Sequence, residues 1–178
     1  MDRRKINKKL KKNKYRIIIS SIAILSIILI GAYIRNRNIE NAIAKYDNEI
    51  LIVKGSGDQL DSLTLKEIRD LGGEKKTVNI NNGLEKVEIE GVSIDKIIGD
   101  LNINLKDRAF ISIEDNDGKQ KRISMSAALE PERIYLVYKI DGSPVFDLNP
   151  INGKLLLIDS SADSSASWIR NVKTIDIE

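Results

Sequence analysis

The residues best suited to bind a polar ligand lie near the end of the chain, around its single tryptophan, Trp168. Residues 160–167 are Ser and Asp separated by Ala, and serine hydroxyls both donate and accept hydrogen bonds. Trp168 offers an apolar wall, and the planar, permanently charged guanidinium of Arg170 suits a carboxylate or phosphate. We therefore predict Ser164, Ser165, Trp168 and Arg170 as ligand-contacting residues. A flexible serine-rich loop and a tryptophan buried in the core are the structural alternatives.

Two turns extend this predicted ligand site. Asp141 and Gly142 follow a strongly β segment, and Asn149 precedes a proline. Glycine is favoured where a turn needs a positive φ, and Asp and Asn stabilise turns through their side chains. We expect the fold to bring both turns to the same end of a sheet as residues 160–167. Each is also explained by turn formation alone.

No catalytic residue is predicted. The chain has no histidine and no cysteine, which excludes Ser-His-Asp and Cys-His catalysis and the usual zinc sites. Glu114, Asp115 and Asp117 form an acidic group, but the other ligands of a calcium loop do not follow them, so a hairpin turn is the simpler interpretation. We predict no metal ligand, and an enzymatic function is the weaker expectation.

The first 34 residues predict the location of the protein in the cell. Residues 1–16 carry nine Lys or Arg and one acid, whereas residues 17–34 carry no charge. At about 1.5 Å per residue the uncharged run spans about 27 Å, close to the ~30 Å hydrocarbon core of a bilayer. The basic head predicts a single-pass helix in the cell membrane with a cytoplasmic N-terminus and an extracytoplasmic domain. A cleavable signal peptide is the alternative, although no small-x-small motif follows the apolar run.

Beyond the membrane segment the chain is acidic. Residues 35–178 keep 20 basic and 25 acidic residues, which argues against a nucleic-acid partner. The expected partners are the lipid bilayer, through residues 17–34, and an unidentified small ligand or a membrane or envelope protein. Residues 35–48 have apolar side chains at helical spacing and predict a juxtamembrane stalk. Residues 49–178 have the length of one ordinary domain.

Hydrophobic periodicity in residues 49–178 predicts the α+β class, a mixed β-sheet domain with two or three short helices. The helices are expected at residues 64–71, where Thr64 and Glu67 form a capping box, and at residues 93–101, capped by Ser93, with a short turn at 127–129. About eight short strands are expected, at residues 50–53, 78–80, 87–89, 109–114, 119–124, 133–140, 154–159 and 169–177.

Four segments then follow one another in an informative order. They are residues 91–98 (G-V-S-I-D-K-I-I), 135–145 (Y-L-V-Y-K-I-D-G-S-P-V), 150–158 (P-I-N-G-K-L-L-L-I) and 168–173 (W-I-R-N-V-K). In this order they resemble four motifs of the sulfite-oxidase-like, molybdopterin-binding oxidoreductase domain. The first two motifs are a helix start, G-V-x-L-x-x-L-L, and a strand followed by N/D-G-x-P-L. The last two are the strands G-x-P-x-R-L-V-x-P and K-W-V-K-x-I. The resemblance covers about residues 49–178 and implies that fold. In that family the loop matching residues 160–167 approaches the substrate pocket.

This sequence differs from the family at the residues that the family uses to hold its cofactor. The family's molybdenum-binding cysteine corresponds to a position near Asn79, and an amide cannot replace a soft, anionic thiolate. The family's arginine in the third motif is replaced by Lys154-Leu155, and its histidines are absent. We therefore expect a membrane-anchored, non-catalytic binding domain with no cofactor. The alternatives are an oxidoreductase that retains molybdopterin without the cysteine, and a structural subunit of a membrane complex.

Overall fold

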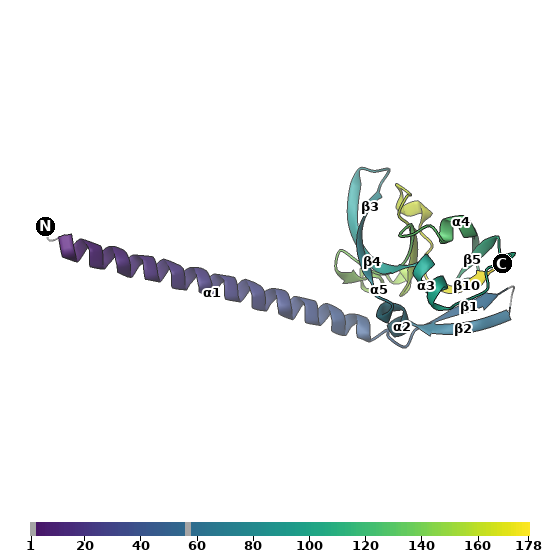
Figure 1. Ribbon diagram of the computed structural model, residues 1–178, viewed down its shortest axis with the longest axis horizontal. Coiled ribbons are helices and arrows are strands. Elements are labelled where there is room, and N and C mark those ends of the chain that lie inside the picture. The colour runs from purple at the N-terminus through teal and green to yellow at the C-terminus, as the bar shows by residue number, and fades with distance from the viewer. Residues whose placement is uncertain (1–2, 56–57) are drawn as a thin grey trace. The chain divides into compact units, whose positions relative to one another are not determined.

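The computed structural model describes the backbone of residues 3–55 and 58–178, and the side chains of residues 14–55, 58 and 60–178. The chain forms two compact units, one ending at Asn41 and the other running from Ala42 to Glu178. The first unit is most of α1 (Arg3–Ala44), a single unbroken helix (Figure 1). The second unit contains every other helix and strand of the described chain.

Helix α1 is long and apolar enough between Lys14 and Ala44 to cross a membrane. It extends beyond the predicted span of residues 17–34 at both ends. Within that span, large apolar side chains are exposed, among them Ile17, Ile27 and Leu29. A helix that is apolar on all sides and not covered by protein is suited to a lipid environment.

The predicted stalk, residues 35–48, contains the end of helix α1 and the first residues of the compact domain. Helix α1 continues through it to Ala44 and is followed by a turn. Ile43 is only 1% exposed and belongs to the core of the second unit. The compact unit that contains the sheets runs from Ala42 to Glu178 and so includes the end of this segment.

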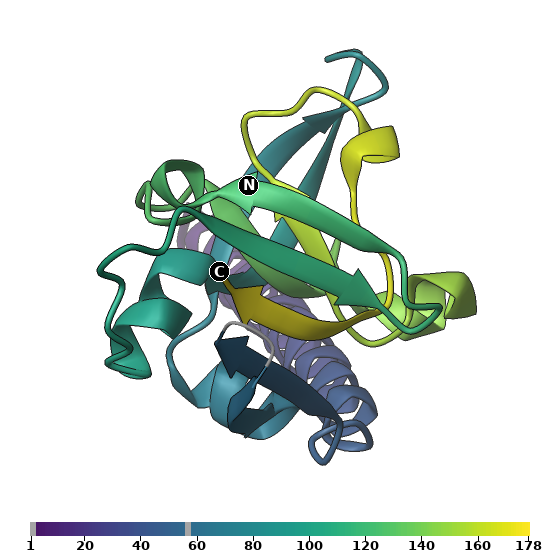
Figure 2. The ribbon, with the colours of Figure 1, turned by 90° about the vertical axis from the view of Figure 1, so that its right-hand side faces the viewer.

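The domain contains two five-stranded sheets, which confirms the predicted α+β class. Sheet A has the order β2-β1-β10-β5-β6, with β1 and β10 parallel and the other neighbours antiparallel. Figure 2 shows β10, in yellow, between the blue β1 and the green β5. The strands of sheet A are β1 (Ile50–Gly55), β2 (Asp58–Thr64), β5 (Phe110–Asp115), β6 (Gln120–Ser124) and β10 (Val172–Ile177).

Sheet B is antiparallel and is built around β7. It has the order β3-β4-β7-β8, and β9 also pairs with β7. All seven residues of β7 are buried, which explains why its sequence is almost continuously apolar instead of alternating. The strands of sheet B are β3 (Glu74–Ile80), β4 (Glu85–Ser93), β7 (Ile134–Ile140), β8 (Ser143–Pro144) and β9 (Leu156–Asp159).

The two faces of sheet B contact two apolar clusters. The larger cluster takes Leu136 and Tyr138 from β7 together with side chains of sheet A and of the helices. The smaller cluster takes Tyr135 and Val137 from the opposite face of β7, and Trp168 packs against it. Successive side chains of a strand point to opposite faces, so β7 contributes to both clusters.

The short helices are α2 (Leu65–Asp70), α3 (Ile94–Asp100), α4 (Met125–Ala128) and α5 (Val145–Leu148), with 3-10 turns η1 (Pro150–Asn152) and η2 (Ser165–Ser167). The predicted capping box of α2 is confirmed, because Glu67 N donates to Thr64 Oγ1 and Thr64 N donates to Glu67 Oε2. Ser93 stands at the start of α3 as predicted, but its hydroxyl makes no capping hydrogen bond. Strand β2 and helix α5 were not predicted.

Glu49 provides an acid-sensitive contact between the start of the domain and sheet A. Its carboxylate binds Lys154 Nζ at 3.0 Å and Lys173 Nζ. Burial acts to raise the pKa of Glu49, but the hydrogen bonds from Lys173 and Lys154 outweigh it, and the pKa lies below its ordinary value. Ionised Glu49 therefore stabilises the fold above its unfolded pKa of about 4.3, and this contribution is lost as pH falls through the lower folded pKa.

We predict that Glu49→Gln flattens the acid dependence of stability. Between about pH 5 and pH 3, the free energy of unfolding of the variant should fall less than that of the natural chain, because one depressed carboxyl no longer takes up a proton on unfolding. Urea denaturation of the full chain in detergent, followed by Trp168 fluorescence, measures this. Glu85→Gln, at an exposed position, is the control. Equal slopes for Glu49→Gln and the natural chain would contradict the prediction.

Candidate functional site

Trp168 and Arg170 are held by a short extended segment that pairs with β9. Ile169 N donates to Leu157 O at 3.0 Å, and Leu157 N donates to Ile169 O at 2.9 Å. Residues two apart in an extended segment point to the same side. Trp168 and Arg170 therefore share one side, while Ile169 packs against the larger core cluster.

The turn between β5 and β6 lies opposite this segment. Asp115 Oδ1 accepts hydrogen bonds from Asp117 N at 2.8 Å and from Lys119 N at 2.9 Å, which fixes a tight turn of the kind aspartate favours. Lys121 Nζ donates to Ser167 O at 3.0 Å and joins β6 to η2. The acidic group at residues 114–117 thus forms a hairpin turn, as the simpler interpretation predicted.

The backbone of Asn171 connects the segment of Trp168 and Arg170 to both the β5–β6 turn and η1. Its N–H donates to Asn152 O at 2.7 Å, and its carbonyl accepts from Asn116 N at 3.1 Å. The first bond attaches η1 and the second attaches the β5–β6 turn. A side chain at Gly153 would meet Asn171 Cα at 2.6 Å, so this close approach requires glycine.

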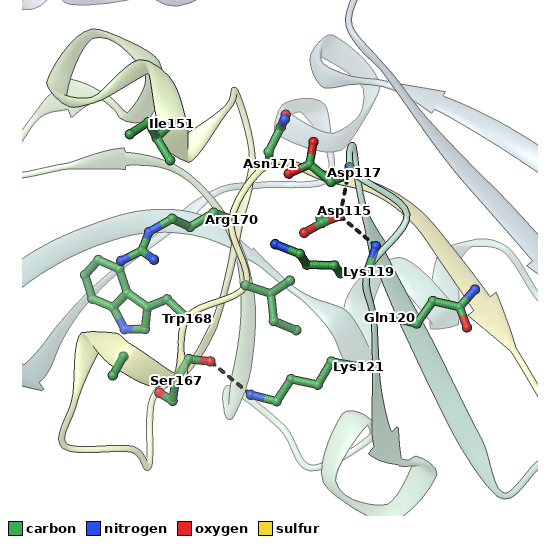
Figure 3. Close-up of a pocket in the computed structure, with 12 residues that line it drawn as sticks. Asp115, Asp117, Lys119, Gln120, Lys121, Ile151, Ser167, Trp168, Arg170 and Asn171 are labelled. Atoms are coloured by element: carbon green, nitrogen blue, oxygen red, sulfur yellow. Dashed lines mark hydrogen bonds between the residues drawn. The ribbon is translucent and has the colours of Figure 1, made fainter.

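Together these segments enclose an open pocket of about 380 Å³. Figure 3 shows Trp168, Arg170 and Ile151 on one side and the β5–β6 turn on the other, with Lys119 reaching into the space between them. The volume lies at the small end of the range of about 300–1,000 Å³ for ligand pockets. The lining residues are Asp115, Asp117, Lys119, Gln120, Lys121, Ile151, Ala166, Ser167, Trp168, Ile169, Arg170 and Asn171.

Several charges in this pocket are uncompensated. Over the side chains that the structure describes, those of Lys119, Arg170 and Asp117 make no hydrogen bond or ion pair. Arg170 is exposed, and Trp168 is half-buried, with an indole N–H that has no partner in the same described part of the chain. The pocket therefore offers two free cations, one free carboxylate and an aromatic wall.

Two of the predicted ligand-contacting residues, Trp168 and Arg170, line the pocket. Ser164 and Ser165 do not; they shape η2 beside it. Ser164 Oγ accepts from Ala166 N at 3.2 Å, and Ser165 O accepts from Trp168 N at 3.3 Å. Ser167 lines the pocket instead. Trp168 serves both the core and the pocket, because it packs on the smaller cluster without being fully buried.

Asp141, Gly142 and Asn149 do not line the pocket, although Asn149 directly precedes η1, whose Ile151 does. Asp141 follows the last residue of β7, whereas Ser160 follows Asp159, which pairs with Ile134 at the first residue of β7. Because β7 and β9 are antiparallel, the two loops leave from opposite ends of the pair. Asp141 Oδ1 accepts from Glu88 N at 2.9 Å, and Asn149 Oδ1 accepts from Ile151 N at 3.0 Å, so both side chains serve turns.

Sequence reasoning missed the basic side of the pocket. Lys119 and Lys121 stand in a hairpin whose sequence predicts only a turn and a returning strand. Their nearness to Trp168 depends on β5 pairing with β10, the strand that follows Asn171 directly. Strand β6 is almost entirely exposed, so its sequence contains no hydrophobic signal for that pairing.

The position expected to match the family's molybdenum ligand does not fit the metal. Asn79 is exposed on β3, and its Nδ2 donates to Asp163 Oδ1 at 3.3 Å. An amide beside carboxylates lacks the soft anionic sulfur that a molybdenum site of this type uses. Among the side chains that the structure describes, no group of three or more His, Cys, Asp or Glu could hold a metal ion.

Comparisons with known proteins find similarity to this chain in structure but not in sequence. No protein-family profile and no curated protein matches the sequence. Among solved structures, the sulfane dehydrogenase SoxCD from Paracoccus pantotrophus is similar, with a TM-score of 0.59 and 13% sequence identity. The similarity covers 74% of this chain and 38% of the SoxCD chain, so this chain spans well under half of that protein. The likeness shows that this chain shares a fold with part of that structure.

Proposed function

We propose that this chain is a single-pass membrane protein whose extracytoplasmic domain binds a small anionic ligand without catalysis. The observation that carries the proposal is the pocket itself. Lys119 and Arg170 offer positive charges that no side chain in the described part neutralises, and they stand beside the wall of Trp168. A carboxylate or phosphate would satisfy both cations.

A molybdopterin-dependent oxidoreductase is the second candidate, since the chain shares a fold with a protein named sulfane dehydrogenase. The amide at Asn79, the carboxylate of Asp163 beside it and the lack of cysteine speak against this candidate. Without a residue to hold the metal, we assign no reaction step to the domain.

We predict that Arg170→Ala weakens anion binding at least about tenfold, because a charge-assisted hydrogen bond contributes roughly 1.5–3 kcal/mol. The free energy of unfolding should change by less than about 0.5 kcal/mol, because Arg170 is exposed and unpaired. Titration of the full chain in detergent with acetate and with inorganic phosphate, followed by Trp168 fluorescence, gives both affinities. Lys106→Ala, an exposed lysine outside the pocket, is the control. Unchanged affinity in Arg170→Ala, or unfolding of the variant, would contradict the assignment.

We predict that the N-terminus of the chain is cytoplasmic and that the domain lies outside the cell membrane. The nine basic residues before residue 17 favour a cytoplasmic N-terminus, so the domain should be accessible from outside. Protease added to intact cells stripped of their wall should digest the chain beyond Arg35. Digestion that occurs only after lysis would contradict an extracytoplasmic domain.

A further inference from the structure

The pocket contains more than the cations needed to bind a simple anion. Asp117 lies in the same turn as Lys119, and its carboxylate makes no ion pair in the part of the chain that the structure describes. A free carboxylate at a site for inorganic phosphate would repel the ligand. It is useful only if the ligand also presents groups that donate hydrogen bonds.

The remaining lining residues divide into an apolar side and a polar side. Trp168 and Ile151 form the apolar side, and Ile151 is 74% exposed at the mouth. Asp117 brings a carboxylate to the other part of the wall, whereas the Gln120 amide donates to Glu114 Oε2 at 3.1 Å. A fitting ligand therefore has an apolar face, several hydroxyl groups at its edge and one negative charge.

We propose that the ligand is an acidic sugar, a pyranose ring carrying a carboxylate, presented by an extracytoplasmic polysaccharide. This inference rests on the proposed anion-binding function and names its ligand class. The carbon–hydrogen face of the ring packs on the indole of Trp168, and the carboxylate binds Arg170 and Lys119. The hydroxyl groups of the ring donate hydrogen bonds to the carboxylate of Asp117.

The size and shape of the pocket favour one unit of a chain. A volume of about 380 Å³ is small for a ligand pocket, and the site is open to solvent. An open pocket lets a polymer continue beyond the bound ring. A free amino acid has the opposite charges that Asp117 and Arg170 could bind, but an open pocket leaves its ammonium group in water and so gains little from pairing it.

The test compares four probes on the full chain in detergent, read by the fluorescence of its single tryptophan. The probes are glucuronate, glucose, acetate and glutamate. We expect glucuronate to bind at least about tenfold more tightly than each of the others, because only glucuronate satisfies the cations, Asp117 and Trp168 together. Acetate binding as tightly as glucuronate would overturn the sugar inference and leave anion binding intact. Glutamate binding most tightly would assign the pocket to amino acids, and the absence of binding by every anion would overturn the proposed function itself.

A pair of matched variants tests the role given to Asp117. Asp117→Ala should lower the affinity for glucuronate about tenfold and so narrow its advantage over acetate, since acetate has no hydroxyl to lose. Asp100→Ala, which removes an exposed carboxylate outside the pocket, should leave the ratio of the two affinities unchanged. An unaltered ratio in Asp117→Ala would overturn the assignment of the hydroxyl groups to Asp117.

Discussion

Gly91→Ala is expected to destabilise the domain by about 3 kcal/mol, because a methyl group there would be forced against the backbone of the central strand. A Cβ at residue 91 would lie 2.8 Å from Val137 Cα and 2.9 Å from Leu136 C. Neither atom can move aside cheaply, since both belong to β7, which is buried along its whole length. The register of β4 against β7 also shifts between Glu90 and Gly91.

Gly99→Ala is the matched control. Gly99 lies in α3, and apart from its chain neighbours and the backbone of its own helix, no described atom stands within 4 Å of a Cβ built there. Alanine in a helix is favoured over glycine by about 0.5–1 kcal/mol, so this variant should be slightly stabilised. Urea denaturation of the full chain in detergent, read by Trp168 fluorescence, compares the two. Equal stability of Gly91→Ala and Gly99→Ala would show that β4 and β7 do not approach as described.

Lys139→Met is expected to cost about 2–4 kcal/mol of stability, because it leaves the carboxylate of Glu90 without its cation in a largely dry place. Lys139 Nζ lies 3.0 Å from Glu90 Oε1, and the two side chains are only 4% and 20% exposed. Tyr138 OH also donates to Glu90 Oε1, at 3.4 Å. This remaining hydrogen bond limits the loss of stability in Lys139→Met.

The exposed pair Lys75–Glu88 provides the control for Lys139. Its atoms are also 3.0 Å apart, but its side chains are 60% and 48% exposed. Lys75→Met should therefore cost less than about 1 kcal/mol. The double variant Lys139→Met with Glu90→Gln should recover at least half of the loss, because no uncompensated charge remains. Similar costs for Lys139→Met and Lys75→Met would refute the burial argument.

The parts of the fold that could be predicted from the sequence depend on local signals. The capping box of Thr64 and Glu67 located α2, and the hairpin turn at residues 81–84 separated β3 from β4. The apolar run of β7 marked the centre of a sheet. Strand β2 was missed because its sequence, D-Q-L-D-S-L-T, is mostly polar and forms a strand only by pairing with β1 at the sheet edge.

The site was less predictable because it depends on strand order. Trp168 and Arg170 could be identified from residue type and spacing. Their neighbours Lys119 and Asp117 are about fifty residues earlier in the sequence and reach the pocket only through the pairing of β5 with β10. Asp141 follows the last residue of β7, whereas Ser160 lies beside its first residue, and the direction in which β9 runs beside β7 cannot be read from either strand alone.

We propose that this domain, which shares a fold with part of the sulfane dehydrogenase SoxCD, binds a ligand and holds no molybdenum. The most direct test is the metal and pterin content of the full chain, purified in mild detergent from its own membranes. We predict no stoichiometric molybdenum by elemental analysis and no pterin fluorescence after oxidation, because Asn79 cannot supply the thiolate that holds the metal. About one molybdenum per chain would contradict the claim and favour the oxidoreductase.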